Sequence, residues 1–435
     1  MEVFPSIEDL RSWADRLEEI QDRLGPYFER AEPRQRAIAY VRGLVSSTER
    51  KNGWQLAELA GEATPDGMQR LLNTAKWDAD QVRDDLQAYI LTHLADPEAV
   101  LVVDETGFLK KGIKSVGVAT QYTGTAGKIA NCQIGVFLAY ANRHGAVLLD
   151  RELYLHADWE KDPERCKEAE VPEERRKTIP KPTLAKPMLA RAFGQGIQAA
   201  WVTGDTVYGG DYKLRSWLEE RLQPYVLAVP KNQRIGLTHR ADEVVASWQA
   251  SRWQRLSAGE GSQGPRFYDW AWQSLDFRWT EPGWKQWLLA RRSLSDPSKI
   301  AYSFVFAPES VSLEQVVRAA GSRWQVEEAF ELAKQQVGLD EYEVRHWQGW
   351  YRHIALAILT VVPRGRAKKG AQFQEQESTQ LLPLTVPEVR RLLWRLVWQA
   401  PATPQRVLYW SRWRRRHQAR AKHFHIKRRA ARLAA

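Results

Sequence analysis

The spacing of hydrophobic and polar positions changes along the chain. Residues 1–96 carry the apolar spacing of amphipathic helices, and from residue 97 short β-branched runs typical of buried strands appear. Strands then alternate with helices up to residue 230, which predicts parallel crossovers within a mixed sheet. The pattern therefore predicts an α/β core preceded by a helical region.

After residue 230 the order changes again. Residues 231–310 form Trp- and Arg-rich runs that predict antiparallel strands, and residues 311–363 return to helical spacing. Residues 364–435 begin with a polar linker and end in a helical, basic region, with Thr385 and Glu388 as an expected capping box. We therefore expect five segments: 1–96, 97–230, 231–310, 311–363 and 364–435.

Two predicted core strands end in a carboxylate. Asp104 follows the run VLVV and Asp205 follows WVTG, so we expect each strand to stop there. Ligands gather at the carboxyl ends of parallel strands, and a buried carboxylate requires water, a cation or a basic partner. Either residue alone is explained by a turn cap, whereas two in one sheet favour a functional site.

A third acid lies in the helical stretch SRWQVEEAFELAK. Arg323, Glu327 and Lys334 share one narrow strip of this helix, along the edge of its apolar stripe. Side chains on that strip can reach the rim of a sheet. Taken alone, the strip would be an ordinary salt-bridged surface.

Together, the motifs VLVVDETGFLKKG, WVTGDTVYGG and RWQVEEAFELAK resemble those of insertion-sequence transposases with an Asp, Asp, Glu catalytic triad. The third is similar to that family's Tyr-Arg-Glu-Lys signature, although Ala320 stands at the Tyr position. The segments GKIANCQIGVF and GLDEYEVRHWQGWYRH narrow the likeness to the IS-seven-hundred-and-one branch of the IS-four-like group. The resemblance implies an RNase H-like core with a β-rich insertion between the second and third acids.

The resemblance also implies a reaction. Asp104, Asp205 and Glu327 would be the catalytic residues and the ligands of two Mg²⁺ ions, with Mn²⁺ as a substitute. The reaction would be DNA cleavage and strand transfer in cut-and-paste transposition, by a homodimer on paired terminal repeats and target DNA. A hydrolytic nuclease on the same core and a non-catalytic DNA-binding descendant are the alternatives.

Further side chains are candidates for DNA contact. By the resemblance, Arg323 and Lys334 would hold phosphates beside the scissile bond, and Lys110 and Lys111 would lie along the DNA backbone. Tryptophans of the insertion could stack on a flipped base, although a place in a small β core is the better explanation for any single one. These tryptophans are Trp270, Trp272, Trp279 and Trp284.

The N-terminal region contains a second candidate. A short helix, a break at Gly61 and a second helix resemble a helix-turn-helix, in which Gln69, Arg70 and Asn73 would contact base edges. Many helical hairpins bind no DNA, so the pattern alone has limited specificity.

The net charge of +11 is concentrated at the C-terminus. Residues 406–435 hold eleven Lys or Arg and no Asp or Glu, so the rest of the chain is neutral overall. Such a segment favours contact with a polyanion, and Arg414, Arg415 and Arg416 are its densest part. A solubilising or disordered tail is the alternative, but the interleaved Trp410 and Trp413 favour an ordered segment.

Composition argues against other classes. The chain has no apolar run of the ~18 residues that a membrane helix needs. A phosphate-binding Gly-x-x-x-x-Gly-Lys motif is also missing, so no nucleotide cofactor is expected. With only Cys132 and Cys166, a disulfide framework is not expected, and we predict a cytoplasmic protein. The resemblance implies a bacterial one.

Overall fold

The computed structural model describes residues 22–143, 145–261, 264–275, 281–370 and 386–398, with backbone alone for 361–370. Isolated residues toward both termini are also described, as is the helical stretch 408–413. Most of residues 1–21, part of the expected helical region, lies outside the described residues, as do Thr385, Trp279 and Arg414.

The N-terminal region is helical, as predicted. The Asn52 side chain accepts hydrogen bonds from the first turn of α3, and Gly61 ends that helix with a φ of 88°. A second short helix follows, so the two helices expected around Gly61 are confirmed. The helices are α2 (Ala31–Val45), α3 (Gly53–Ala60), α4 (Asp66–Asn73) and α5 (Ala79–Leu94).

The core is a mixed sheet, which confirms the predicted fold class. Strand β1 (Val100–Leu109) pairs antiparallel with β3 (Lys128–Asn142) and parallel with β5 (Trp201–Gly204). Strand β5 pairs parallel with β6 (Tyr225–Val229). A hairpin joins β3 to β4 (Gly145–Tyr154). A short strand that the pattern did not reveal, β2 (Ala119–Thr123), pairs antiparallel with β3.

Strand β1 does not end at Asp104, so that expectation is wrong. The strand continues to Leu109 because β3 is long enough to pair with all of it, up to the pair Leu109↔Cys132. What ends beside Asp104 is the parallel pairing with β5, whose last pair is Val103↔Gly204. Asp104 is therefore a mid-strand residue next to the end of its neighbour.

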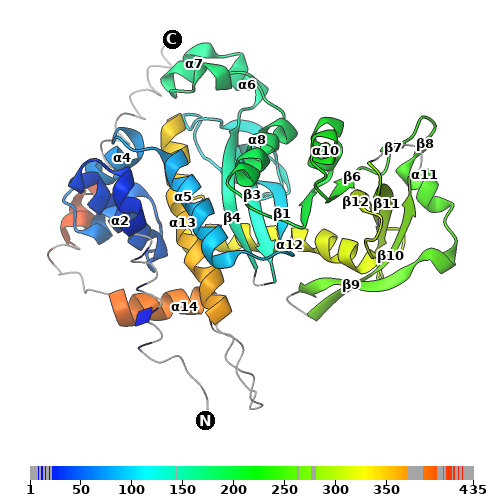
Figure 1. Cartoon of the computed structure of the whole chain (residues 1–435). Coiled ribbons are helices and arrows are strands. Elements are labelled where there is room, and N and C mark those ends of the chain that lie inside the picture. The colour runs from blue at the N-terminus through cyan, green and yellow to red at the C-terminus, as the bar shows by residue number, and fades with distance from the viewer. Residues whose placement is uncertain are drawn as a thin grey trace.

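The strands of the expected insertion continue this same sheet. Strand β12 (Ile300–Pro308) pairs antiparallel with β6, and β11 (Trp284–Arg292), β10 (Gly264–Ser274) and β9 (Gln254–Gly261) follow in order. The result is one sheet of ten strands, with the β-rich half at one side of the molecule and the N-terminal helices at the other (Figure 1). The segment boundaries at 230 and 310 stay predictions. A small separate unit of β7 (Arg234–Ile235), β8 (His239–Arg240) and α11 (Ala241–Ala246) lies on the outer side of the β-rich half (Figure 1).

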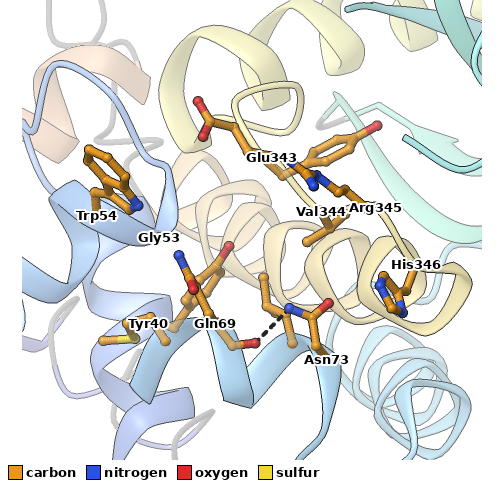
Figure 2. A pocket seen from close by; sticks show the side chains of 12 residues that line it. Tyr40, Gly53, Trp54, Gln69, Asn73, Glu343, Val344, Arg345 and His346 are labelled. Carbon is orange, nitrogen blue, oxygen red and sulfur yellow. Dashed lines mark hydrogen bonds between the residues drawn. The ribbon is translucent and has the colours of Figure 1, made fainter. Parts of the chain in front are cut away.

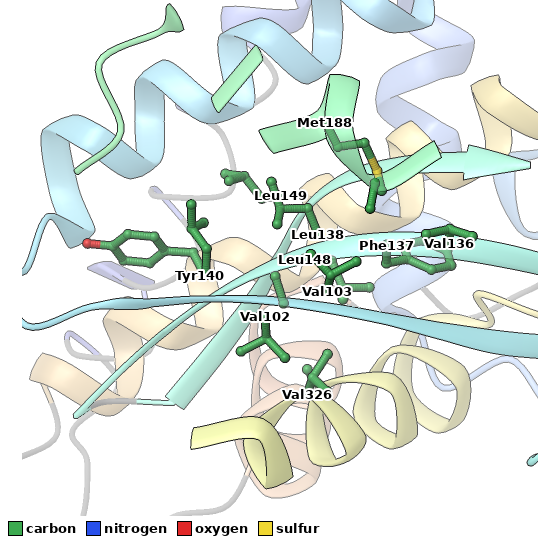
Figure 3. Close-up of a cluster of buried hydrophobic side chains, with 14 of the residues drawn as sticks. Val102, Val103, Val136, Phe137, Leu138, Tyr140, Leu148, Leu149, Met188 and Val326 are labelled. Atoms are coloured by element: carbon green, nitrogen blue, oxygen red, sulfur yellow. The ribbon is translucent and has the colours of Figure 1, made fainter. Parts of the chain in front are cut away.

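Helices cover both faces of the core. Met188 of α8 (Lys181–Gly194) and Val326 of α12 (Leu313–Val337) lie on opposite sides of β1 (Figure 3). A Ser312–Gln315 capping box begins α12, and Gly338, with a φ of 66°, ends it. The apolar stripe expected on this helix is buried, comprising Val326, Phe330, Ala333 and Val337.

Helix α13 (Trp347–Gly370) runs beyond the boundary expected at residue 363. A linker starting at 364 is therefore wrong for 364–370, where Arg, Ala and Lys continue the helix as good helix formers. No helix within the described part of the chain is long and apolar enough to cross a membrane. The remaining helices are α6 (Ala157–Glu160), α7 (Pro163–Glu168), α9 (Thr206–Gly209), α10 (Tyr212–Glu219) and α14 (Val386–Leu393), followed by a π turn at Trp394–Trp398.

Candidate active site

The two predicted aspartates meet through strand register. Because Val103 pairs with Gly204, the next residues of the two parallel strands, Asp104 and Asp205, lie side by side. Asp104 is buried, with 7% of its surface exposed, whereas Asp205 is half-buried and caps α9 by accepting from Val207 N at 2.8 Å.

Helix α12 brings a cation to these acids. Arg323 Nη2 lies 3.3 Å from Asp104 Oδ2, and Nη1 of the same guanidinium lies 3.7 Å from Glu327 Oε1. Asp104 points to the α12 face of the sheet because alternate residues of β1 face opposite sides. The structure thus brings all three predicted acids to one place, with Arg323 between the first and the third.

The environment of the two aspartates disfavours their charge. Burial raises the pKa of Asp104 to about 7, with a further rise from the charge of Asp205, while the Arg323 guanidinium opposes both. Burial also raises the pKa of Asp205, and the nearby Glu105 carboxylate adds to that rise. The positive charge of Arg323 therefore does not offset the cost of ionising both aspartates, and additional positive charge at the site would favour their ionised forms.

Asp104, Asp205 and Glu327 have the ligand atoms that a divalent cation requires, but they are not arranged as a complete coordination site. Carboxylate oxygens are the donors that Mg²⁺ prefers. Within the described residues, however, no group of three or more His, Cys, Asp or Glu side chains is gathered closely enough to hold a metal ion. Arg323 occupies the space between Asp104 and Glu327, so it must move for both carboxylates to share a cation.

Glu105 is a site residue that the sequence interpretation missed. It follows Asp104 on β1 and therefore faces the opposite side of the sheet. Its Oε1 accepts from Lys181 Nζ at 2.6 Å, and its Oε2 accepts from Tyr208 Oη at 2.6 Å. Since Tyr208 lies on α9, which Asp205 caps, these bonds link the strand of one aspartate to the helix of the other. The signal available in the sequence was a second acid directly after the first.

A pocket of about 490 Å³ opens beside the acids. Asp205, Arg323 and Glu327 line it from the core. Two further arginines, Arg266 and Arg291, line it from the β-rich half. Arg266 Nη2 donates to Gly321 O at 3.1 Å, and Arg291 Cζ lies 4.6 Å from the centroid of the Tyr268 ring. An opening with arginines on its walls and carboxylates at one side suits a phosphodiester.

The tryptophans expected to stack on a base have packing roles. Trp270 is buried, Trp272 stacks on Trp287 at 5.1 Å, and Trp284 stacks on Phe306 at 4.8 Å between ring centroids. Of these three, Trp270 alone lines the pocket. Ala320, at the expected Tyr position, also lines it.

The lysines near the site differ in their surroundings. Lys334 Nζ donates to Gly107 O at 2.9 Å, and burial lowers its pKa. Lys110 donates to Tyr342 O at 2.9 Å, and burial lowers its pKa to about 8. Lys111 is exposed. Two of the three lysines expected to bind DNA therefore hold backbone carbonyls in this structure.

The residues predicted on α4 lie apart from the acids. Gln69 and Asn73 line a pocket of about 380 Å³ and face Arg345 and His346 across it (Figure 2). Asn73 is half-buried and donates to Gln69 O at 2.9 Å, whereas Arg70 is exposed to solvent.

Of the basic C-terminal arginines, Arg415 and Arg416 are exposed and helical. Arg414 lies outside the described residues. The order expected from the interleaved tryptophans is confirmed for Trp410, which is 1% exposed.

Comparison with known proteins shows the family of the chain. Residues 23–262, more than half of the chain, match the family described as DDE superfamily endonuclease, and residues 178–362 match the transposase DDE domain. Asp104 and Asp205 fall in the first match, and Asp205 and Glu327 in the second. DDE transposase families act on DNA and are metal-dependent.

One similar protein comes from Microchaete diplosiphon and is described as "Probable transposase for insertion sequence element IS701". It is 24% identical over 310 residues, which cover 70% of this chain and 75% of the relative. With three acids brought together by a mixed sheet and one long helix, the chain belongs to the DDE superfamily of endonucleases and carries a transposase DDE domain.

Proposed function

We propose that this DNA transposase performs cut-and-paste transposition at a site formed by Asp104, Asp205 and Glu327. The observation that carries the proposal is the adjacency of the two aspartates, set by the Val103↔Gly204 register and reached by Arg323 and Glu327 of α12. Cleavage and joining of DNA both require an activated oxygen nucleophile and a stabilised leaving oxygen.

The proposed cofactor is Mg²⁺, bound as two ions, with Mn²⁺ as a substitute. Asp104, Asp205 and Glu327 would hold these ions. When bound, the ions supply the positive charge that activates the nucleophile and stabilises the leaving oxygen. Their charge would also favour the ionised forms of Asp104 and Asp205, whose pKa values burial raises.

We propose that the Arg323 side chain moves from the two carboxylates to the DNA phosphate. Its guanidinium now pairs with Asp104 and Glu327, and it lines the adjoining pocket. Once free of these two carboxylates, its guanidinium would bind the scissile phosphate through two N–H donors. Lys334, which donates to Gly107 O of β1, would stabilise this part of the strand next to that phosphate or contact the phosphate directly.

DNA contact is proposed for the remaining candidates, Gln69, Arg70, Asn73, Lys110, Lys111, Arg415 and Arg416. Joining two ends requires two active sites, so we propose a homodimer on paired terminal repeats. A cytoplasmic location is part of the same proposal.

The test uses labelled duplexes with the element's own ends, a supercoiled target, and either Mg²⁺ or chelator. We expect Asp104→Asn, Asp205→Asn and Glu327→Gln each to abolish cleavage and joining while end binding persists. Glu331→Gln is the matched control, because Glu331 is an exposed acid on the same helix.

Each alternative has its own outcome in this assay. A wild-type protein that nicks but never joins is a hydrolytic nuclease, and one that binds ends without cutting is a non-catalytic descendant. Triad variants that cut as well as wild type would place the active site elsewhere.

A further inference from the structure

The helical residues 408–413, together with Arg415 and Arg416, are called the C-terminal helix here, and this helix packs against the N-terminal helices. Tyr409 Oη donates to Ala63 O, in the turn between α3 and α4, at 3.1 Å. The rings of Trp413 and Trp54, on α3, meet edge to face with centroids 4.7 Å apart. Trp410 is 1% exposed and lies 5.3 Å from Trp413. Figure 1 shows this red segment beside the blue N-terminal helices.

This docking separates an apolar side of the helix from a basic one. The helical period puts Trp410 and Trp413 on the docked side and Arg412 and Arg415 on another. Arg412, Arg415 and Arg416 are exposed, and no acid among the described residues forms an ion pair with them. Aromatic anchors thus hold the helix in place and leave its guanidinium groups available.

The docked helix is also close to α4. Trp54, which contacts Trp413, lines the same pocket as Gln69 of α4. A Cβ on the adjoining Gly53 would lie 3.8 Å from Gln69 Cγ, so the start of α3 and the exposed side of α4 are neighbours. Arg70 follows Gln69 on α4 and is exposed.

We propose that the C-terminal helix and the α3–α4 pair form one composite surface for duplex DNA. Arg412, Arg415 and Arg416 would bind phosphates of the same duplex that α4 contacts. The partner is a polyanion because this part of the sequence lacks acids, and a duplex because the basic groups border a helical pair of the kind that enters a groove. The inference rests on the proposed function, since it assumes that the chain binds the ends of its element.

If the composite surface binds DNA, the affinity depends on the packing of the C-terminal helix against α3 as well as on its positive charge. A basic tail that acted alone would bind DNA equally well whether or not Trp413 contacted Trp54. In the composite surface, loss of that contact lets the arginines move away from α4, so the affinity falls although every charge remains.

The test measures binding of full-length protein by fluorescence anisotropy in chelator, with end duplex and unrelated duplex over a series of NaCl concentrations. Arg415→Gln with Arg416→Gln should weaken both duplexes equally and lower the salt slope by about 2, since each phosphate contact contributes about 0.9. Lys231→Gln with Arg234→Gln is the charge-matched control near β7, on the opposite side of the molecule from the N-terminal helices (Figure 1), and it should leave the slope unchanged.

Trp413→Ala tests the packing of the helix. It should weaken end binding by about 3- to 10-fold and make the basic C-terminal segment more sensitive to trypsin, and Trp413→Phe should restore the affinity and the resistance to trypsin. An unchanged slope in the double arginine variant, or wild-type affinity in Trp413→Ala, would overturn the composite surface. A wild-type protein that binds neither duplex would instead overturn the proposed function.

Discussion

Arg323 of α12 pairs with Asp104 of β1, with Nη2 and Oδ2 3.3 Å apart. This contact joins a helix and a strand that are 219 residues apart in sequence. It places a fixed positive charge where the proposed metal ions would contribute theirs, and it gives the site a metal-free arrangement that must rearrange.

The first prediction concerns that rearrangement. Arg323→Ala should not weaken Mn²⁺ binding at pH 8.5, where Asp104 is ionised, because the guanidinium competes with metal for the same carboxylates. Cleavage should nevertheless fall by about 10²- to 10³-fold, since a cation that stabilises the phosphate is lost. Electron paramagnetic resonance of bound Mn²⁺ and single-turnover cleavage measure the two effects. Parallel losses of metal binding and cleavage would contradict the proposed role of Arg323.

The second prediction concerns pH and stability. The pKa of Asp104 is raised from its ordinary value of 3.8 to about 7, so folding favours its protonated form. The metal-free protein should therefore keep this contribution below about pH 4 and lose it as the pH rises toward 7 and above. At pH 8, Asp104→Asn should be more stable than wild type by about 2–4 kcal/mol.

Urea unfolding in chelator at pH 5 and pH 8 measures this difference. The gain from Asp104→Asn should be larger at pH 8, whereas a gain independent of pH would show that Asp104 does not titrate in this range. At limiting Mg²⁺ concentration, wild-type cleavage should fall as the pH drops below 7, because protons then compete with metal for the Asp104 carboxylate.

The third prediction concerns the link between the two aspartates. Tyr208→Phe removes the 2.6 Å hydrogen bond to Glu105 and should destabilise the fold by about 1.5–3 kcal/mol, the usual value for a hydrogen bond to a charged group. Since α9 also carries the Asp205 cap, cleavage should slow while end binding is unchanged. Tyr212→Phe, on an exposed side chain of α10, is the control for urea unfolding and cleavage rate.

The fourth prediction concerns the position of α9 on the sheet. A Cβ on Gly209 would lie 1.9 Å from the backbone Ala228 O of β6. Gly209→Ala should therefore push α9 away and destabilise the protein by about 2–3 kcal/mol, with loss of cleavage. Gly112→Ala, where an added Cβ meets nothing within 4 Å, should change the free energy of unfolding by less than about 0.5 kcal/mol. Equal thermal stability of the two variants would argue against the close packing of α9.

Sequence alone predicted the class of the fold and singled out the three acids that the structure brings together. Asp104 and Asp205 each follow an apolar run, and that local pattern needs no tertiary information. The period of α12 likewise put Arg323 and Glu327 on one strip, because helical geometry fixes which residues share a face.

Tertiary structure decided what the local pattern could not express. The length of β1 depended on β3, a partner that no local window contains, so the strand runs through Asp104 to Leu109. The bond from Glu105 to Tyr208 and the docking of Trp413 on Trp54 join residues 103 and 359 positions apart. Such contacts follow from the packing of whole elements, and side-chain spacing along the chain carries no record of them.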